Sequence, residues 1–184
     1  MRPAPLLMAG LFAVLVLLAL TAAAGAQGAH HRAARGPVEL PYFMDFRARD
    51  GGVLGHTFVV YGRIDGRGRA REAGSAGLYP DDKYSESFLP VFIPVPAYVN
   101  IKKEDPSLAV GAVYRRRLSA RQYARLQLAL LRLRTQHGRW HLVFNNCNDF
   151  AAQVAHAIGL WTPPSLVRPD TFVRGLRALN GPGH

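Results

Sequence analysis

Residues 54–63 read LGHTFVVYGR, and this stretch decides the fold class of the chain. Its letters FVVY are β-branched or aromatic, and such residues favour a strand. The Asp65-Gly66 pair that follows is typical of a hairpin turn, so residues 70–78 are expected to return as a second strand. The sequence therefore predicts an antiparallel hairpin.

Strand-forming composition also occurs on both sides of this hairpin. The segment upstream combines two prolines with three aromatic residues, which excludes a helix and favours extended backbone. Further strands are expected at residues 38–47, 98–102 and 112–118, with an irregular excursion over the proline-rich residues 79–96.

The second half of the chain changes to helical spacing. Ser119 is a preferred N-cap residue, and apolar residues recur at helical intervals from there through about Gln136. A short strand is expected over residues 140–144. The next helix begins at Asn145 or Asn146, since asparagine favours the N-cap position.

That helix is expected to stop at Gly159, and a last one is predicted over residues 171–179. The chain has 184 residues, which suits one domain, here residues 38–184. The sequence thus predicts an α+β fold in which an antiparallel sheet carries a few helices.

The N-terminus has the pattern of a secretory signal. Residues 1–26 carry one charge, Arg2, followed by an apolar run over residues 6–20 and a small-residue exit. The alternative is an uncleaved membrane anchor over residues 5–26, which approaches the length of a span. Either way we expect an exported protein, periplasmic or secreted, with residues 27–37 as a polar linker.

The chain is strongly basic, with 20 Arg and 3 Lys and a formal net charge of +11. Such a charge suits an anionic neighbour, for example a membrane face, a cell-wall polymer or nucleic acid. In an exported protein a solvated or lipid-facing surface is the better interpretation, so no nucleic-acid partner is expected.

A single cysteine excludes an internal disulfide and any zinc site built on several cysteines. His137 and His141 have the spacing of metal ligands, but Gly138 lies between them and no acidic third ligand is near. The sequence therefore predicts neither a metal nor a cofactor.

Cys147 lies in the first turn of the expected helix, where the helix dipole favours a thiolate and lowers a thiol pKa. The alternative is a small buried cysteine that fills core volume. The sulfur is expected on the inward face, because apolar residues follow it at offsets of three, four, seven, eight and eleven: Phe150, Ala151, Val154, Ala155 and Ile158.

A thiolate nucleophile needs a base, and two histidines are candidates. His56 opens a predicted strand, and His141 precedes the cysteine helix. His156 lies on the same helix as Cys147 but about 13 Å along it, too far to share a proton. A hydrogen-bonded sheet histidine is the alternative for both candidates.

Two motifs carry a family resemblance: Gly-His-Thr-Phe-Val at residues 55–59 and Asn-Cys-Asn-Asp-Phe at residues 146–150. This order resembles the circularly permuted papain-like group, which includes lecithin–retinol acyltransferase-like and NlpC-type families. The resemblance implies that Cys147 is the nucleophile and His56 the base.

Members of the group usually orient the imidazole with a further polar residue. Gly68 stands where the acyltransferase-like members carry a second histidine. Glu72 on the returning strand is the nearest substitute, and a merely exposed strand glutamate is the alternative.

Two functions follow as hypotheses. The first is an exported thiol hydrolase or acyltransferase that attacks amide or ester bonds of a cell-wall peptide or lipid and passes through a thioester. The second is a non-catalytic envelope module that binds wall or lipid, or a membrane surface, through its Arg-rich surface.

Overall fold

The computed structural model describes residues 40–50, 55–85, 87–100 and 110–183. The predicted signal or anchor and the linker, residues 1–37, lie outside the described residues. Within the described ranges, no helix is both long and apolar enough to cross a membrane.

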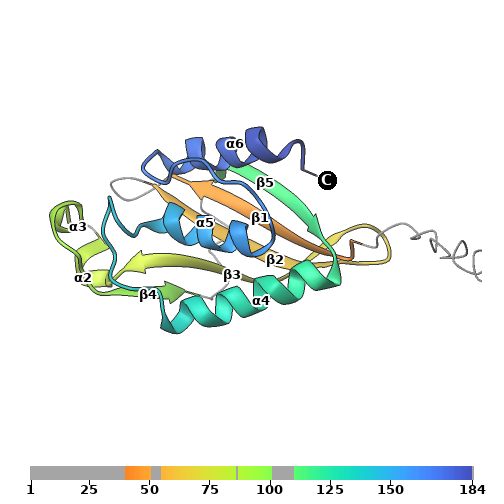
Figure 1. Cartoon of the computed structure of the whole chain (residues 1–184), viewed down its shortest axis with the longest axis horizontal. Coiled ribbons are helices and arrows are strands. Elements are labelled where there is room, and N and C mark those ends of the chain that lie inside the picture. The colour runs from red at the N-terminus through yellow and green to blue at the C-terminus, as the bar shows by residue number, and fades with distance from the viewer. Residues whose placement is uncertain (1–39, 51–54, 86, 101–109, 184) are drawn as a thin grey trace, which may run out of the picture. The chain divides into compact units, whose positions relative to one another are not determined.

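Five strands form one antiparallel sheet in the order β4-β3-β2-β1-β5, as Figure 1 shows. The predicted hairpin is confirmed: Asp65 accepts the Gly68 N–H, and its carboxylate accepts the backbone N–H groups of Arg67 and Arg69. Gly68 has φ +75°, which glycine adopts without strain. The strands are β1 (Tyr42–Arg49), β2 (His56–Ile64), β3 (Ala70–Pro80), β4 (Ala97–Asn100) and β5 (Val110–Leu118).

The helices confirm the α+β class. Ser119 caps α4 through a reciprocal capping box with Gln122, as its position predicts. The excursion after β3 contains two single-turn helices. The helices are α2 (Asp82–Ser85), α3 (Leu89–Phe92), α4 (Ala120–Thr135), α5 (Cys147–Ala157) and α6 (Pro169–Asn180).

The strand predicted at residues 140–144 is wrong. Trp140 forms only an isolated bridge with Val95, and His141 pairs with Asn145 across a tight turn. The Asn145 side chain donates to the carbonyls of His137 and Arg139. Those bonds fold the segment back on itself, and such local bonds compete with strand pairing.

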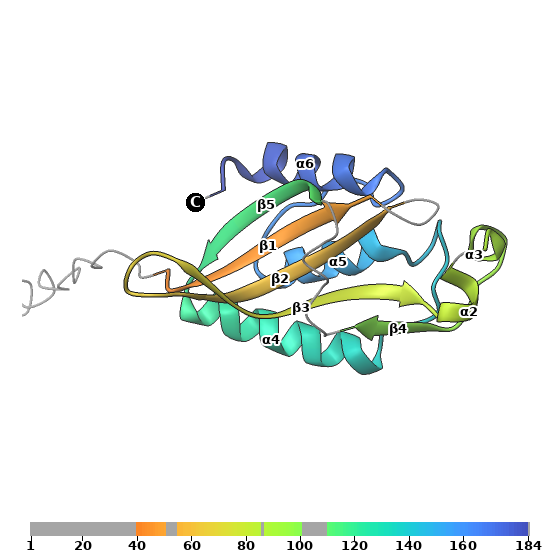
Figure 2. The ribbon, with the colours of Figure 1, turned by 180° about the vertical axis from the view of Figure 1, so that it is seen from behind.

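The long helices α4, α5 and α6 cover the same face of the sheet, since their buried side chains share one core cluster with the strands. Figure 2, seen from behind, shows the strands in front of these helices. On β2, Val59 and Tyr61 belong to the helix-side core, whereas Phe58 and Val60 form a second cluster on the other face. This alternation decides which β2 side chains can meet α5.

Candidate functional site

Cys147 is the first residue of α5, as the sequence predicts. Asn146 is the N-cap: its side-chain oxygen accepts the N–H groups of Asn148 (2.7 Å) and Asp149 (3.1 Å). The Asp149 carboxylate in turn accepts the Asn146 N–H at 2.8 Å. This capping box fixes the helix start and hence the place of the sulfur.

Asn148 ties the start of α5 to the sheet and to the loop before α6. Its Oδ1 accepts the Thr57 hydroxyl at 2.6 Å, and its Nδ2 donates to the carbonyls of Ser165 (2.8 Å) and Val167 (2.9 Å). Both Thr57 and Asn148 are buried. This pair was not predicted from the sequence, although alternation along β2 places Thr57 on the same face as Val59.

Burial raises the pKa of the Cys147 thiol, contrary to the lowering expected at a helix N-terminus. Backbone N–H groups of Thr57, Cys147 and Asn148 hydrogen-bond the sulfur and favour the thiolate, but they do not offset the loss of solvation. Repulsion from the Asp149 carboxylate acts in the same direction as burial. The thiol is therefore protonated at neutral pH.

The sulfur borders a pocket of about 250 Å³. Its walls are mainly apolar and come from Gly55, Trp140, Leu142, the start of α5 at residues 146–148 and the segment 165–169. Among the described residues that line it, Cys147 and Arg168 alone have titratable side chains. The Arg168 side chain is 72% exposed, and its guanidinium approaches the carboxylates of Asp50 (3.9 Å) and Asp170 (3.5 Å).

His56 begins β2 as predicted, but its imidazole packs on the face away from α5. The ring lies 4.1 Å from the Tyr79 ring and 6.2 Å from the Phe58 ring, measured between centroids. Its Nε2 is buried and has no hydrogen-bond partner among the described residues. Gly77 permits this placement, because a Cβ there would come within 2.7 Å of Nε2.

The expected contact between His56 and Cys147 is therefore absent from the part of the chain that the structure describes. The adjacent residue, Thr57, takes the place beside α5 instead. Burial, with a smaller contribution from the charge of Arg49, lowers the pKa of the His56 imidazole to about 3. The ring is neutral at physiological pH and a weak base.

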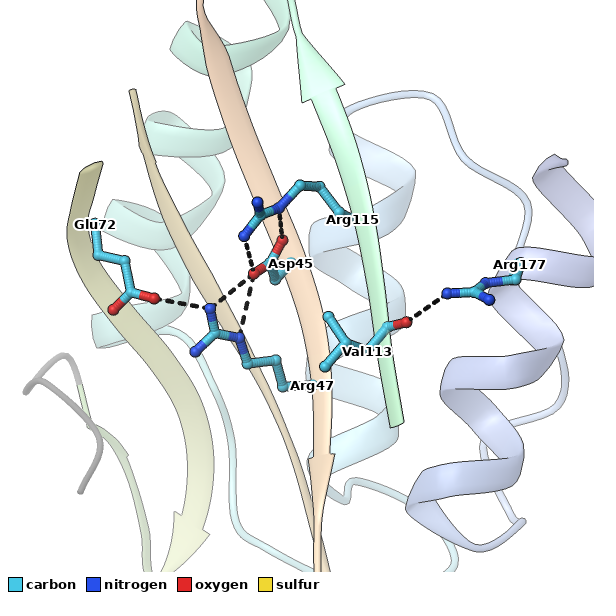
Figure 3. Close-up of polar contacts among 6 residues, drawn as sticks. All are labelled: Asp45, Arg47, Glu72, Val113, Arg115 and Arg177. Carbon is cyan, nitrogen blue, oxygen red and sulfur yellow. Dashed lines mark hydrogen bonds and ion pairs between the residues drawn. The ribbon is translucent and has the colours of Figure 1, made fainter. Parts of the chain in front are cut away.

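Glu72 does not orient His56. Its register partner on β2 is Gly62, six residues or about 20 Å along the strand from His56. Its carboxylate instead accepts Arg47 Nη2 at 2.8 Å. Arg47 also donates to the buried Asp45 carboxylate, which Arg115 contacts at 2.6 and 2.8 Å (Figure 3).

The other candidate base, His141, is buried outside the pocket lining. Its Nδ1 accepts the Val143 N–H at 3.1 Å, and its ring packs 4.7 Å from the Phe144 ring. The Nδ1 atom of His137 lies 2.8 Å from the carbonyl oxygen of the next residue, Gly138. In the described ranges, no three His, Cys, Asp or Glu side chains are grouped as metal ligands would be.

Comparisons with known protein families, with curated proteins and with solved structures found no match to this chain.

Proposed function

We propose that the chain is an exported envelope protein that binds the apolar chain of a lipid in the Cys147 pocket, without catalysis. The observation that carries this proposal is the pocket lining. Its walls are apolar, and no imidazole or carboxylate among the described lining residues can take the thiol proton. Nucleophilic catalysis by a thiol requires such a base.

The chemistry of the pocket suits an aliphatic chain with an anionic end. Each methylene transferred from water contributes about 0.8 kcal/mol. The protonated thiol of Cys147, one of the lining residues, acts as a small apolar group. Arg168 at the mouth can pair with a carboxylate or phosphate, and a guanidinium does so with two parallel hydrogen bonds.

Lipid would bind at one defined site and not across a diffuse Arg-rich surface. Many arginines are already engaged: Arg47 and Arg115 bind Asp45, and Arg69 and Arg71 bind Asp65. Arg168 differs because it combines exposure with a place on the pocket lining.

A thiol hydrolase or acyltransferase of permuted papain-like fold is the second candidate. One observation favours it: the backbone of Thr57, Cys147 and Asn148 lowers the pKa of the Cys147 thiol, against the effect of burial. Fixed N–H donors of this kind stabilise a thiolate or an oxyanion that forms beside it. The sulfur would attack the carbonyl carbon of an amide or ester and pass its proton through His56 to the amine or alcohol that leaves. Water or an acceptor would then take the acyl group from the thioester and release the thiol. This candidate requires His56 to turn toward α5.

Displacement of a fluorescent fatty acid tests the first proposal. Leu166→Glu places a carboxylate on the pocket wall at a position 56% exposed, which the fold tolerates. We expect it to weaken binding about tenfold or more, the cost of opposing an apolar chain with a charge. Leu131→Glu is the control, since Leu131 is similarly exposed on α4 outside the pocket lining.

Equal binding by both variants would contradict the pocket proposal. The second candidate is tested by treating the same samples with an activated acyl ester and measuring the mass of the intact protein by mass spectrometry. A stable or transient acyl adduct that Cys147→Ala abolishes would establish covalent chemistry in place of simple binding.

A further inference from the structure

The side of α4 that points away from the core carries two exposed leucines. Leu128 is 67% exposed and Leu131 62%, one helical turn apart. The buried side chains of α4 lie on the opposite side: Leu126, Leu130 and Leu133. A surface helix normally has polar side chains opposite its core-facing stripe. We call this surface the outer face of α4 and define it by four exposed residues at intervals of four, three and four positions: Ala124, Leu128, Leu131 and Thr135.

Contacts on the inner side of α4 keep the outer face outward. Tyr123 stacks on Tyr42 of β1, with 4.1 Å between the ring centroids. Gln122 Nε2 donates to the Ile158 carbonyl at the end of α5 at 3.3 Å. Figures 1 and 2 show α4 and α6 along opposite edges of the fold, with α5 between them. The outer face is therefore a free surface of the part of the chain that the structure describes.

Arginines border the outer face on both sides. A step of about 100° per residue places Arg121, Arg125 and Arg132 along one border. Arg134 lies near the other border, and all four side chains are exposed. The sequence of α4 contains no acidic residue. Among the described contacts none of the four binds a carboxylate, and Arg132 Nε donates to the neutral Gln136 side chain at 3.3 Å.

Carboxylates on the neighbouring elements do not offset this charge. The elements packed against α4 are α5, β1, β4 and β5, and their acidic residues are Asp45 and Asp149. Asp45 is fully buried and already paired with two arginines. Asp149 accepts the Asn146 N–H in the capping box. Arg63 adds a cation beside α4, because its guanidinium lies 5.3 Å from the ring of Tyr42, which stacks on α4. The described charges at α4 are therefore positive in sum.

We propose that the outer face of α4 lies on an anionic lipid bilayer, with its two leucines at the headgroup boundary and its bordering arginines at the lipid phosphates. Apolar area and attraction to anionic headgroups both strengthen such binding, and arginine stems can lie along the apolar boundary while the guanidinium stays at the headgroups. The leucines favour a bilayer over nucleic acid or another polyanion, because only the bilayer removes them from water.

This inference stands apart from the proposed function. The pocket takes one lipid chain, whereas the outer face meets the surface of a bilayer. No residue of the outer face is among the described residues that line the pocket. Fatty-acid displacement is measured without vesicles, so Leu131→Glu remains a valid control there.

The test is fluorescence quenching by brominated lipids in vesicles of phosphatidylglycerol or phosphatidylcholine, with the full chain in the Trp161→Phe background. Leu128→Trp places a reporter on the outer face of α4. Phe92→Trp is the matched control reporter on α3, at a position 75% exposed. The described charges around that control position cancel: Lys83 and Arg139 against Asp81 and Asp82.

We expect phosphatidylglycerol vesicles to quench the α4 reporter at least twice as strongly as the α3 reporter and to shift its emission to the blue. Phosphatidylcholine vesicles should leave both reporters unquenched. A local readout is needed because residues 6–20 are themselves apolar. The remaining tryptophan, Trp140, is 8% exposed and contributes the same background to both proteins.

Arginine variants of the α4 reporter protein test the contribution of charge. Arg121→Gln with Arg125→Gln removes two charges at the outer face. Arg69→Gln with Arg71→Gln removes two from the β2–β3 hairpin and is the control. We expect the first pair to lower the quenching at least twofold and the second pair to leave it unchanged, because a basic residue acts on the headgroups only when it lies near them.

Equal quenching of the two reporters, or equal quenching of the α4 reporter by both lipids, would overturn the inference. An emission change of the α4 reporter on duplex DNA without quenching by lipid would also overturn it and assign the outer face to a polyanion. Intact quenching of the α4 reporter, together with fatty-acid binding that Leu166→Glu does not weaken, would refute the pocket proposal alone.

Discussion

Two consecutive residues at the start of β2 show how different the faces of the sheet are. Thr57 points toward α5, where its hydroxyl and the Asn148 side chain satisfy each other. His56 points the other way, and its Nε2 is buried beside the Tyr79 ring with no hydrogen-bond partner in the described part of the chain. A shift of one residue in a strand exchanges the faces, so a functional histidine and a structural one can differ by a single position.

The largest expected loss of stability comes from removing a buried charge on the face of the sheet that the helices do not cover. Asp45 is fully buried and forms ion pairs with both Arg47 and Arg115, so Asp45→Ala leaves two cations without their shared carboxylate. We expect a loss of about 3–5 kcal/mol in the free energy of unfolding, measured by urea denaturation. Glu72→Gln is the control and should cost less than about 1 kcal/mol, because that ion pair is exposed. Similar losses in both variants would contradict this ordering.

On the helix face, Asn148→Ala removes one buried and two partly buried hydrogen bonds and leaves the buried Thr57 hydroxyl without its Asn148 partner. We expect a loss of about 3 kcal/mol, since each buried group left without a partner costs roughly 1–3 kcal/mol. Cys147→Ala, one position earlier, should cost only about 1 kcal/mol. A small effect of Asn148→Ala would mean that Asn148 does not hold α5 to β2.

Burial of the His56 imidazole on the face away from α5 should make the stability of the protein depend on pH. Folding lowers the pKa of His56 from 6.5 to about 3, so between these values the unfolded chain binds a proton that the folded chain does not. The free energy of unfolding is therefore highest above pH 6.5 and decreases as the pH falls toward 3. Between pH 6.5 and 4.5 the wild type should lose about 2 kcal/mol more than His56→Phe, at roughly 1.4 kcal/mol per pKa unit. The figure includes a discount because His56 as a whole residue is only partly buried, although its Nε2 atom is buried. Parallel urea curves for the two proteins at both pH values would show that the imidazole is solvated.

Local signals predicted most of the fold. The β2–β3 hairpin, the Ser119 cap and the start of α5 depend on residues within a few positions of one another, so they could be read from the chain. The segment at residues 140–144 has strand composition, but the distant Val95 and the Asn145 side chain decide its path. Composition alone does not contain those partners.

The candidate site was predicted less well, because its chemistry depends on which face of the sheet each side chain occupies and on how far each side chain is buried. Cys147 could be placed in the first turn of a helix, but the extent of its burial, which sets the direction of its pKa shift, comes from tertiary packing. The face of the sheet on which His56 lies follows from which β2 residues belong to the helix-side core. Glu72 lies far from His56, since the register of β3 places it beside Gly62.

The most direct test of the proposed function is the pH dependence of Cys147 alkylation, compared between the wild type and His56→Phe. A protonated thiol apart from any base predicts a single inflection above the ordinary thiol pKa of about 8.5, the same in both proteins. An inflection near neutral pH that His56→Phe abolishes would contradict it. That result would show that the imidazole reaches the sulfur and that the protein is a thiol enzyme.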